Sequence, residues 1–144
     1  MANSINGFKC EEIYQLYAFV EAYEVAGIKS FQTQTSLFRN HPEVKELLNV
    51  LSKVKCHCTR KDMTSIDFKR LNNEIYFTEY HVSNLLSLLY HLRNSIAHAN
   101  AVKDENSVLV IDYKVKRPTD FSARGRIEMA IINGFTEVLK KFEL

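Results

Sequence analysis

At 144 residues, with 46% hydrophobic and 25% charged residues, the chain has the size and composition of one globular domain. A net charge of +2 is too small to indicate a nucleic-acid-binding protein by itself, so any basic site has to be local. Three cysteines do not suggest a disulfide framework, and neither a signal-like start nor a run of about 18 apolar residues occurs. We therefore expect a single domain over 1–144 in the cytoplasm, with neither export nor membrane spanning.

Three segments show clear helical periodicity. The first, 10–27, carries apolar residues at helical spacing and ends at Gly27. The second, 40–54, places Pro42 in the first turn, where a helix tolerates proline. The third, 79–99, has the strongest apolar stripe in the chain, which consists of Val82, Leu85, Leu86, Leu89, Leu92 and Ile96. We expect a long helix from each segment.

The pattern between and after these helices is less regular. The segment 56–77 begins with a polar, basic stretch and then carries three apolar residues at the spacing of a short helix, namely Phe68, Leu71 and Ile75. The segment 107–115 alternates between two sets of side chains, which is the spacing of a strand. The sequence does not identify the strand that pairs with it: the segment 74–77, another chain and a distorted hairpin are the three alternatives.

The carboxyl end carries a further apolar helical face, which consists of Ile127, Ala130, Ile131, Val138, Leu139 and Phe142. Asp120 or Ser122 is the candidate cap at its start. Four glycines and two prolines leave little room for long loops. These elements predict an all-α fold: an up-and-down bundle of four or five helices, with a short β-strand or hairpin insertion between the last two long helices.

The end of the third helix, LLYHLRNSIAHAN over 88–100, carries an arginine and two histidines. At about 100° per residue, Arg93 lies about 40° from the centre of the apolar stripe and so points into it. His98 lies at about 180°, near His91 and Asn94, which places it about 140° from Arg93. Arg93 and His98 can therefore meet on one substrate only if the helix loosens between them or if two chains each contribute one residue.

The hexapeptide RNSIAH, Arg93 to His98, resembles the Arg-x4-His motif of the HEPN superfamily, and its place at the end of a long apolar helix fits that family. The resemblance implies a helical bundle that forms a homodimer, with the two motifs facing each other across a cleft and RNA as the usual substrate. In family members that are ribonucleases, the ribose 2′-hydroxyl attacks the adjacent phosphate without a metal ion or a cofactor. Carried over, His98 would move a proton, Arg93 would bind the phosphate, and Asn94 would orient His98 or the substrate.

The same resemblance favours a toxin or defence effector that cleaves RNA and is restrained by an antitoxin or a regulatory protein. HEPN toxins that are silenced by nucleotide transfer resemble an Arg-x4-His-x-Tyr pattern, whereas Ala99 and Asn100 follow the histidine here. That mode of silencing is therefore in doubt. HEPN domains also serve as noncatalytic modules that bind a nucleotide, RNA or a partner protein, so the motif leaves two classes of function open.

The motif residues also have plain structural interpretations. Arg93 could pair with a carboxylate such as Glu79 or Glu128. His98 could be a histidine that interacts with the negative end of the helix dipole. His91 shares the face of His98 and is either a solvated side chain or a minor contact to substrate.

Two other groups could bind something. Cys56 to Cys58 read CHC, but no second pair of metal-binding residues accompanies them, so we expect no metal site. Arg124 and Arg126 follow the basic run KVKRP and are candidate contacts to an RNA backbone. They would serve the substrate only if the fold placed them beside Arg93 and His98.

Overall fold

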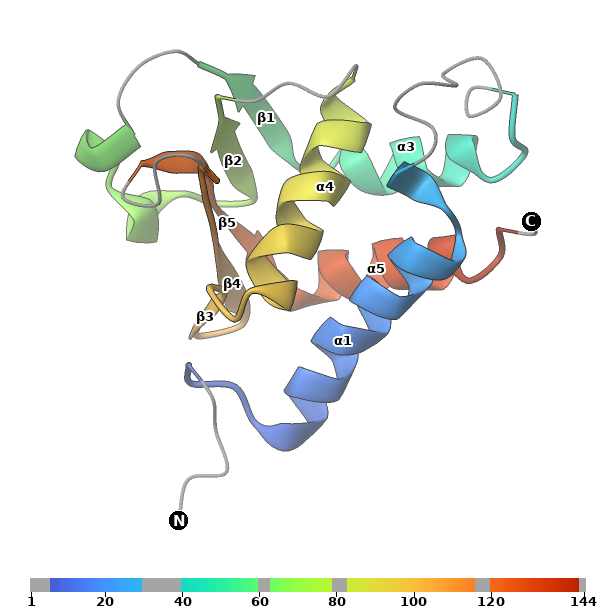
Figure 1. Cartoon of the computed structure of the whole chain (residues 1–144), viewed down its shortest axis with the longest axis horizontal. Helices are drawn as coiled ribbons and strands as arrows, with labels where there is room; N and C mark the ends of the chain where they lie inside the picture. The colour runs from blue at the N-terminus through green and yellow to red at the C-terminus, as the bar shows by residue number, and fades with distance from the viewer. Residues whose placement is uncertain (1–5, 30–39, 60–62, 79–82, 116–119, 143–144) are drawn as a thin grey trace.

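A five-stranded mixed sheet organises the computed structural model, which describes residues 6–29, 40–59, 63–78, 83–115 and 120–142 (Figure 1). The strand order is β1-β2-β5-β4-β3, in which β1 and β2 pair in parallel and all other neighbours are antiparallel. The strands are β1 (Lys55–Cys58), β2 (Glu74–Phe77), β3 (Val102–Asp104), β4 (Ser107–Tyr113) and β5 (Phe121–Glu128).

The α-helices of the described residues gather on one face of this sheet, while two short 3-10 turns lie on the other side (Figure 1). Helix α4 is central, because one of its sides packs on β4 and another packs on α1. The helices are α1 (Cys10–Val25), α3 (Val44–Leu51), α4 (Asn84–Ala97) and α5 (Met129–Leu139), and the turns are η2 (Met63–Ser65) and η3 (Phe68–Arg70).

The expected all-α fold is wrong, because three stretches that lack a clear strand pattern form much of the sheet. Strands β1 and β2 have four residues each, too few to show a period. In β5 the inward positions include Ala123 and Gly125, so much of the inward face carries small residues in place of the large apolar side chains that usually mark a strand. Gly125 is needed for close strand pairing, since a Cβ there would lie 2.6 Å from the carbonyl oxygen of Glu74.

The three helices with clear periodicity are confirmed over the described residues as α1, α3 and α4. Gly27 follows the end of the first of them with a left-handed φ of +68°. Pro42 precedes the second, which starts only at Val44. Ser83 caps the third, where its hydroxyl accepts a hydrogen bond from the N–H of Leu86 at 3.1 Å. The segment 79–82 lies outside the described residues.

The expectations for the carboxyl-terminal half need correction. The strand expected over 107–115 is confirmed as β4, which ends at Tyr113. Of the partners left open, a hairpin forms, with β3, and β5 pairs along the other side of β4. The segment 74–77 pairs with β5 and not with β4. The last helix begins at Met129, so Asp120 and Ser122 do not cap it. The buried Ile127 belongs to the strand before it, which is why the face of the helix seemed to start too early.

The core forms between the sheet and the helices, with α4 in its middle. Nine of the fourteen residues of α4 are buried, including three polar ones, Ser87, His91 and Ser95. A helix that packs on two neighbours buries more than one stripe, which explains why its polar residues are also inside. Within the described ranges, no helix combines the length and apolar character needed to span a bilayer.

Candidate functional site

Helix α4 stays regular up to its end and exposes His98 there. The backbone N–H of His98 donates to the carbonyl of Asn94 at 3.0 Å, so the helix does not loosen between Arg93 and His98. Ala99 then adopts a left-handed φ of +58°, and the N–H of Asn100 donates to the carbonyl of Ser95 at 2.9 Å, which is the Schellman ending of a helix. The chain therefore turns away just after His98 and leaves its side chain exposed.

Arg93 lies at the rim where α4 meets α1. Its Nε–H donates to the carboxylate of Glu24 at 2.7 Å, and its Nη1 donates to the side-chain oxygen of Asn94 at 3.1 Å. The Arg93 side chain is 31% exposed and that of Glu24 is 49% exposed. The guanidinium is thus fixed by two contacts, and its Nη2 group has no hydrogen-bond partner among the described residues.

The carboxylate partner of Arg93 differs from the two expected from the sequence. Glu128 bonds to the side chain of Asn73 at 2.7 Å, and Glu79 lies outside the described residues. Glu24 takes this role because α1 packs along α4 and brings its last turn to the rim. An ion pair at this degree of exposure contributes little to stability, so it leaves Arg93 able to bind another anion.

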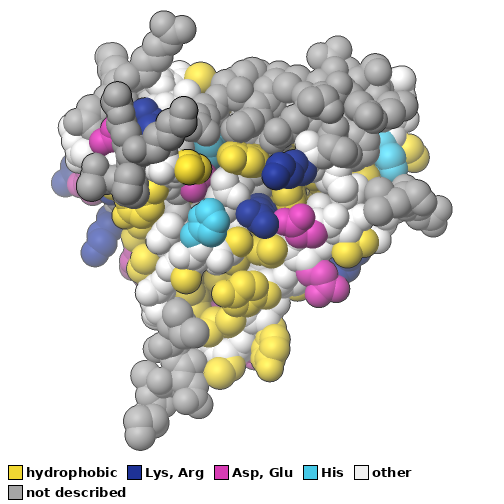
Figure 2. Space-filling model, in the orientation of Figure 1, with side chains coloured by type: hydrophobic (Ala, Val, Ile, Leu, Met, Phe, Trp, Pro, Cys, Tyr) yellow, Lys and Arg dark blue, Asp and Glu magenta, His cyan; other side chains and the backbone are white. Residues whose placement is uncertain are grey.

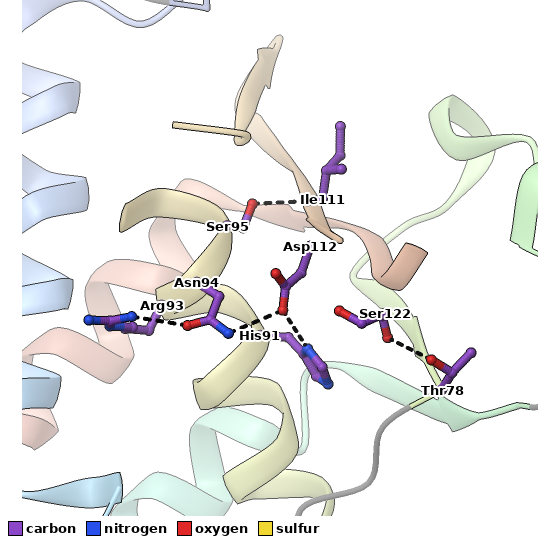
Figure 3. Close-up of polar contacts among 8 residues, drawn as sticks. All are labelled: Thr78, His91, Arg93, Asn94, Ser95, Ile111, Asp112 and Ser122. Carbon is purple, nitrogen blue, oxygen red and sulfur yellow. Dashed lines mark hydrogen bonds and ion pairs between the residues drawn. The ribbon is translucent and has the colours of Figure 1, made fainter. Parts of the chain in front are cut away.

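A fully buried pair lies beneath Arg93, between α4 and the sheet (Figure 3). The Nδ1 of His91 is 2.9 Å from an oxygen of Asp112, and the two side chains are 0% and 4% exposed. With the Asp112 carboxylate as the acceptor, the Nδ1–H of His91 is the donor in this bond. The imidazole also stacks on the ring of Phe77, with centroids 5.7 Å apart. Asp112 occupies an inward position of β4, after Val108 and Val110.

Asn94 joins this buried pair to the exposed guanidinium. Its Nδ2 donates to the same Asp112 oxygen at 3.3 Å, while its Oδ1 accepts from Arg93 (Figure 3). A neighbouring contact ties the helix to the strand, because the N–H of Ile111 donates to the hydroxyl of Ser95 at 2.9 Å. The side chain of Asn94 therefore contacts Arg93 and Asp112 among the described residues, and its expected role of orienting His98 or the substrate stays a prediction.

Three of the residues expected to bind substrate lie elsewhere. His91 is fully buried, so it cannot touch an RNA directly. Arg124 and Arg126 point to the face of β5 opposite Ala123 and Ile127, where Arg124 donates to the carbonyl of Met63 and Arg126 bonds to Asp104. The sheet separates both arginines from α4, and the fold does not bring them to Arg93.

The surface around the motif is mixed in character. Figure 2 shows a histidine and cationic side chains beside an acidic one near the middle of the face formed by α4 and α1, with hydrophobic side chains spread below them. An apolar hollow adjoins the end of α4, and Asn6 donates there to the carbonyls of Ala99 and Ala101. The hollow is lined by Asn6, Phe8, Ile13, Leu16, Tyr17, Ile96, Ala99 and Ala101.

Other titratable groups near the motif do not compete for its chemistry. Burial raises the pKa of Tyr23, which precedes Glu24, so its phenol stays protonated near neutral pH.

The CHC segment on β1 is not arranged as a metal site. The side chains of Cys56 and His57 alternate across the strand, which prevents the three residues from converging on one ion. In the part of the chain that the structure describes, no three His, Cys, Asp or Glu side chains form a group that could hold a metal ion.

The sequence gives a weak signal for Asp112 and none for Glu24. A carboxylate on the same strand face as two valines should have suggested a buried ion pair, but the alternation left open which face was inward. Glu24 is one of several acidic residues on α1 and lacks any distinguishing spacing. No protein family, curated protein or solved structure matches this chain significantly.

Proposed function

We propose that the protein is a metal-independent endoribonuclease whose site combines Arg93 of one chain with His98 of a second copy. The observation that supports this proposal is the placement of the two motif side chains. Arg93 is fixed at its base yet reaches solvent, and His98 is exposed at the end of the same regular helix. Because they project from different sides of α4, two copies provide the simplest way to apply both to one phosphate.

The proposed reaction uses each residue for one task. His98 accepts the proton of the ribose 2′-hydroxyl, and the oxygen attacks the adjacent phosphorus. As that O–P bond forms, the bond from phosphorus to the 5′-oxygen breaks, and the leaving oxygen takes a proton from solvent. Arg93 stabilises the charge on the phosphate oxygens through its Nη2 group, which has no hydrogen-bond partner among the described residues. The products are a 2′,3′-cyclic phosphate and a 5′-hydroxyl end.

The likeness to HEPN ribonucleases is confined to the motif and its helix, because the surrounding fold is not the bundle that the likeness implies. Within the proposal, the cellular role is that of a toxin or defence effector held in check by a partner protein. The exposed Arg93 and His98 are accessible to such an inhibitor as well as to RNA.

The test is to incubate the purified protein with total RNA and excess chelator and to identify the ends that form. We expect cleavage that leaves 2′,3′-cyclic phosphate, and its loss in Arg93→Ala and His98→Ala. Arg70→Ala and His57→Ala are matched controls, since Arg70 is exposed, His57 is half-buried on β1, and both are distant in sequence from the motif. Equal cleavage by the wild type and both motif variants would refute the proposal.

One observation favours a second candidate, a noncatalytic module that binds a nucleotide or RNA. Glu24 already pairs with Arg93 at 2.7 Å, which reduces the positive charge that the guanidinium presents to a phosphate in a transition state. Such a module would bind a labelled oligonucleotide in an Arg93-dependent manner and leave it intact. Intact RNA after binding separates this candidate from the nuclease.

A further inference from the structure

We propose that Asp112 is a positioning residue for the site: it holds Asn94, and through Asn94 it fixes the plane of the Arg93 guanidinium. This inference rests on the proposed function of Arg93. It assigns a role to β4, which lies outside the helix that carries the motif. The strand thereby becomes a part of the site and is more than a support for the core.

The contacts define a direction for the Asn94 side chain. Asp112 accepts from Asn94 Nδ2 at 3.3 Å, which turns Oδ1 outward to accept from Arg93 Nη1 at 3.1 Å. If the amide were reversed, its nitrogen would face the guanidinium and its oxygen would face a carboxylate, and both contacts would be repulsive. An anion at position 112 therefore selects the one amide orientation that holds Arg93.

The base of this arrangement is rigid. Asp112 is 3% exposed, and it is fixed by His91 at 2.9 Å on the helix side. A separate bond, from the N–H of Ile111 to the hydroxyl of Ser95, joins the same strand and helix without touching Asn94. The bond between Asp112 and His91 is the one that anchors the Asn94 amide. Buried hydrogen bonds of this kind hold a side chain at the rim in one geometry, which is what a group that must meet a phosphate requires.

Glu24 acts on the other side of the guanidinium, through Nε at 2.7 Å. Asn94 and Glu24 together leave Nη2 as the edge that faces a ligand. Loss of Asp112 would free the Asn94 amide to rotate, so that Arg93 would keep only its bond to Glu24. We expect the rate of cleavage to fall more than the affinity for RNA, because the charge on the phosphate oxygens increases in the transition state.

The experiment compares Asp112→Ala and Asn94→Ala with Ser95→Ala. The serine variant removes a buried bond between the same helix and strand but leaves the contacts of Asn94 untouched. For cleavage of a short single-stranded RNA in chelator, kcat should fall about 10- to 100-fold in the first two variants, with KM nearly unchanged, and stay near the wild-type value in Ser95→Ala. The Nε–H resonance of Arg93 in NMR spectra should shift in the first two variants only.

Asn94→Ala keeps the test decisive if Asp112→Ala fails to fold, because Asn94 is only half-buried. Folded Asp112→Ala or Asn94→Ala protein with the wild-type kcat, or with an unchanged Arg93 resonance, would overturn the positioning role. A wild-type protein that leaves RNA intact would instead refute the nuclease, and the Arg93 resonance would then still decide whether Asp112 positions the guanidinium.

Discussion

Replacing Asp112 with valine should destabilise the protein by about 2 kcal/mol, although valine suits the inward face of β4. The substitution leaves the Nδ1–H of His91 in a fully buried position without its acceptor, which costs about 1–3 kcal/mol. The Asn94 amide is half-buried and can bond to water instead, so it adds little. His91→Leu should cost about 3–5 kcal/mol, because it leaves the buried carboxylate without its main partner.

The double variant His91→Leu/Asp112→Val removes both polar groups and should lie within about 1 kcal/mol of the wild type. The coupling energy between the two sites should therefore be at least about 4 kcal/mol, the sum of the two single costs less that of the double variant. The measurement is denaturant unfolding of the four proteins, followed by circular dichroism, with equal m-values as the condition for comparison. Costs that add, or an Asp112→Val variant as stable as the wild type, would refute the claim that His91 and Asp112 form a buried pair.

Three other predictions concern the fold. Gly125→Ala should cost about 2–4 kcal/mol in denaturant unfolding, because the added Cβ would meet the backbone of β2, and an unaffected midpoint would contradict this pairing. The hydrogen bond from Lys103 lowers the pKa of Glu12 below its ordinary 4.5. The stabilisation that ionised Glu12 gives the folded protein is therefore fully present above pH 4.5 and is lost as the pH falls through the pKa that Glu12 has in the folded protein. Thermal melts should therefore show the advantage of the wild type over Glu12→Gln shrinking below that pH, and a constant difference would refute it. Burial raises the pKa of Cys56 to about 11, so a thiol reagent at about pH 8 should label exposed Cys58 much faster, as peptide mapping would show.

The helices that carry a long apolar stripe could be predicted from the sequence because their apolar residues recur at helical spacing over several turns. The stripe of α4 predicted that Arg93 points into the packing face, whereas its side chain lies at the rim of that face and is 31% exposed. The sheet could not be predicted because its strands are short or carry small inward residues such as Ala123 and Gly125. Sheet pairing depends on partners far apart in the chain, as when β2 joins β5, and no local pattern encodes that choice.

The site could be predicted only where it is local. Arg93, Asn94 and His98 lie on one helix, and their spacing alone indicated that a single chain keeps Arg93 and His98 apart. The long-range partners are different, since Glu24 is 69 residues from Arg93 and Asp112 is 21 residues from His91. Their contacts follow from the packing of α1 and β4 on α4, and the local sequence pattern does not specify which residues that packing brings together.

The most direct test of the central claim is complementation between two inactive variants. Arg93→Ala and His98→Ala chains, each with its own affinity tag, would be co-expressed and the mixed dimer isolated through both tags. If each site takes Arg93 from one chain and His98 from the other, the mixed dimer has one intact site and should recover up to about half of the wild-type cleavage per dimer. A mixed dimer as inactive as either parent, while a wild-type dimer prepared in the same way cleaves RNA, would contradict a site shared between two chains.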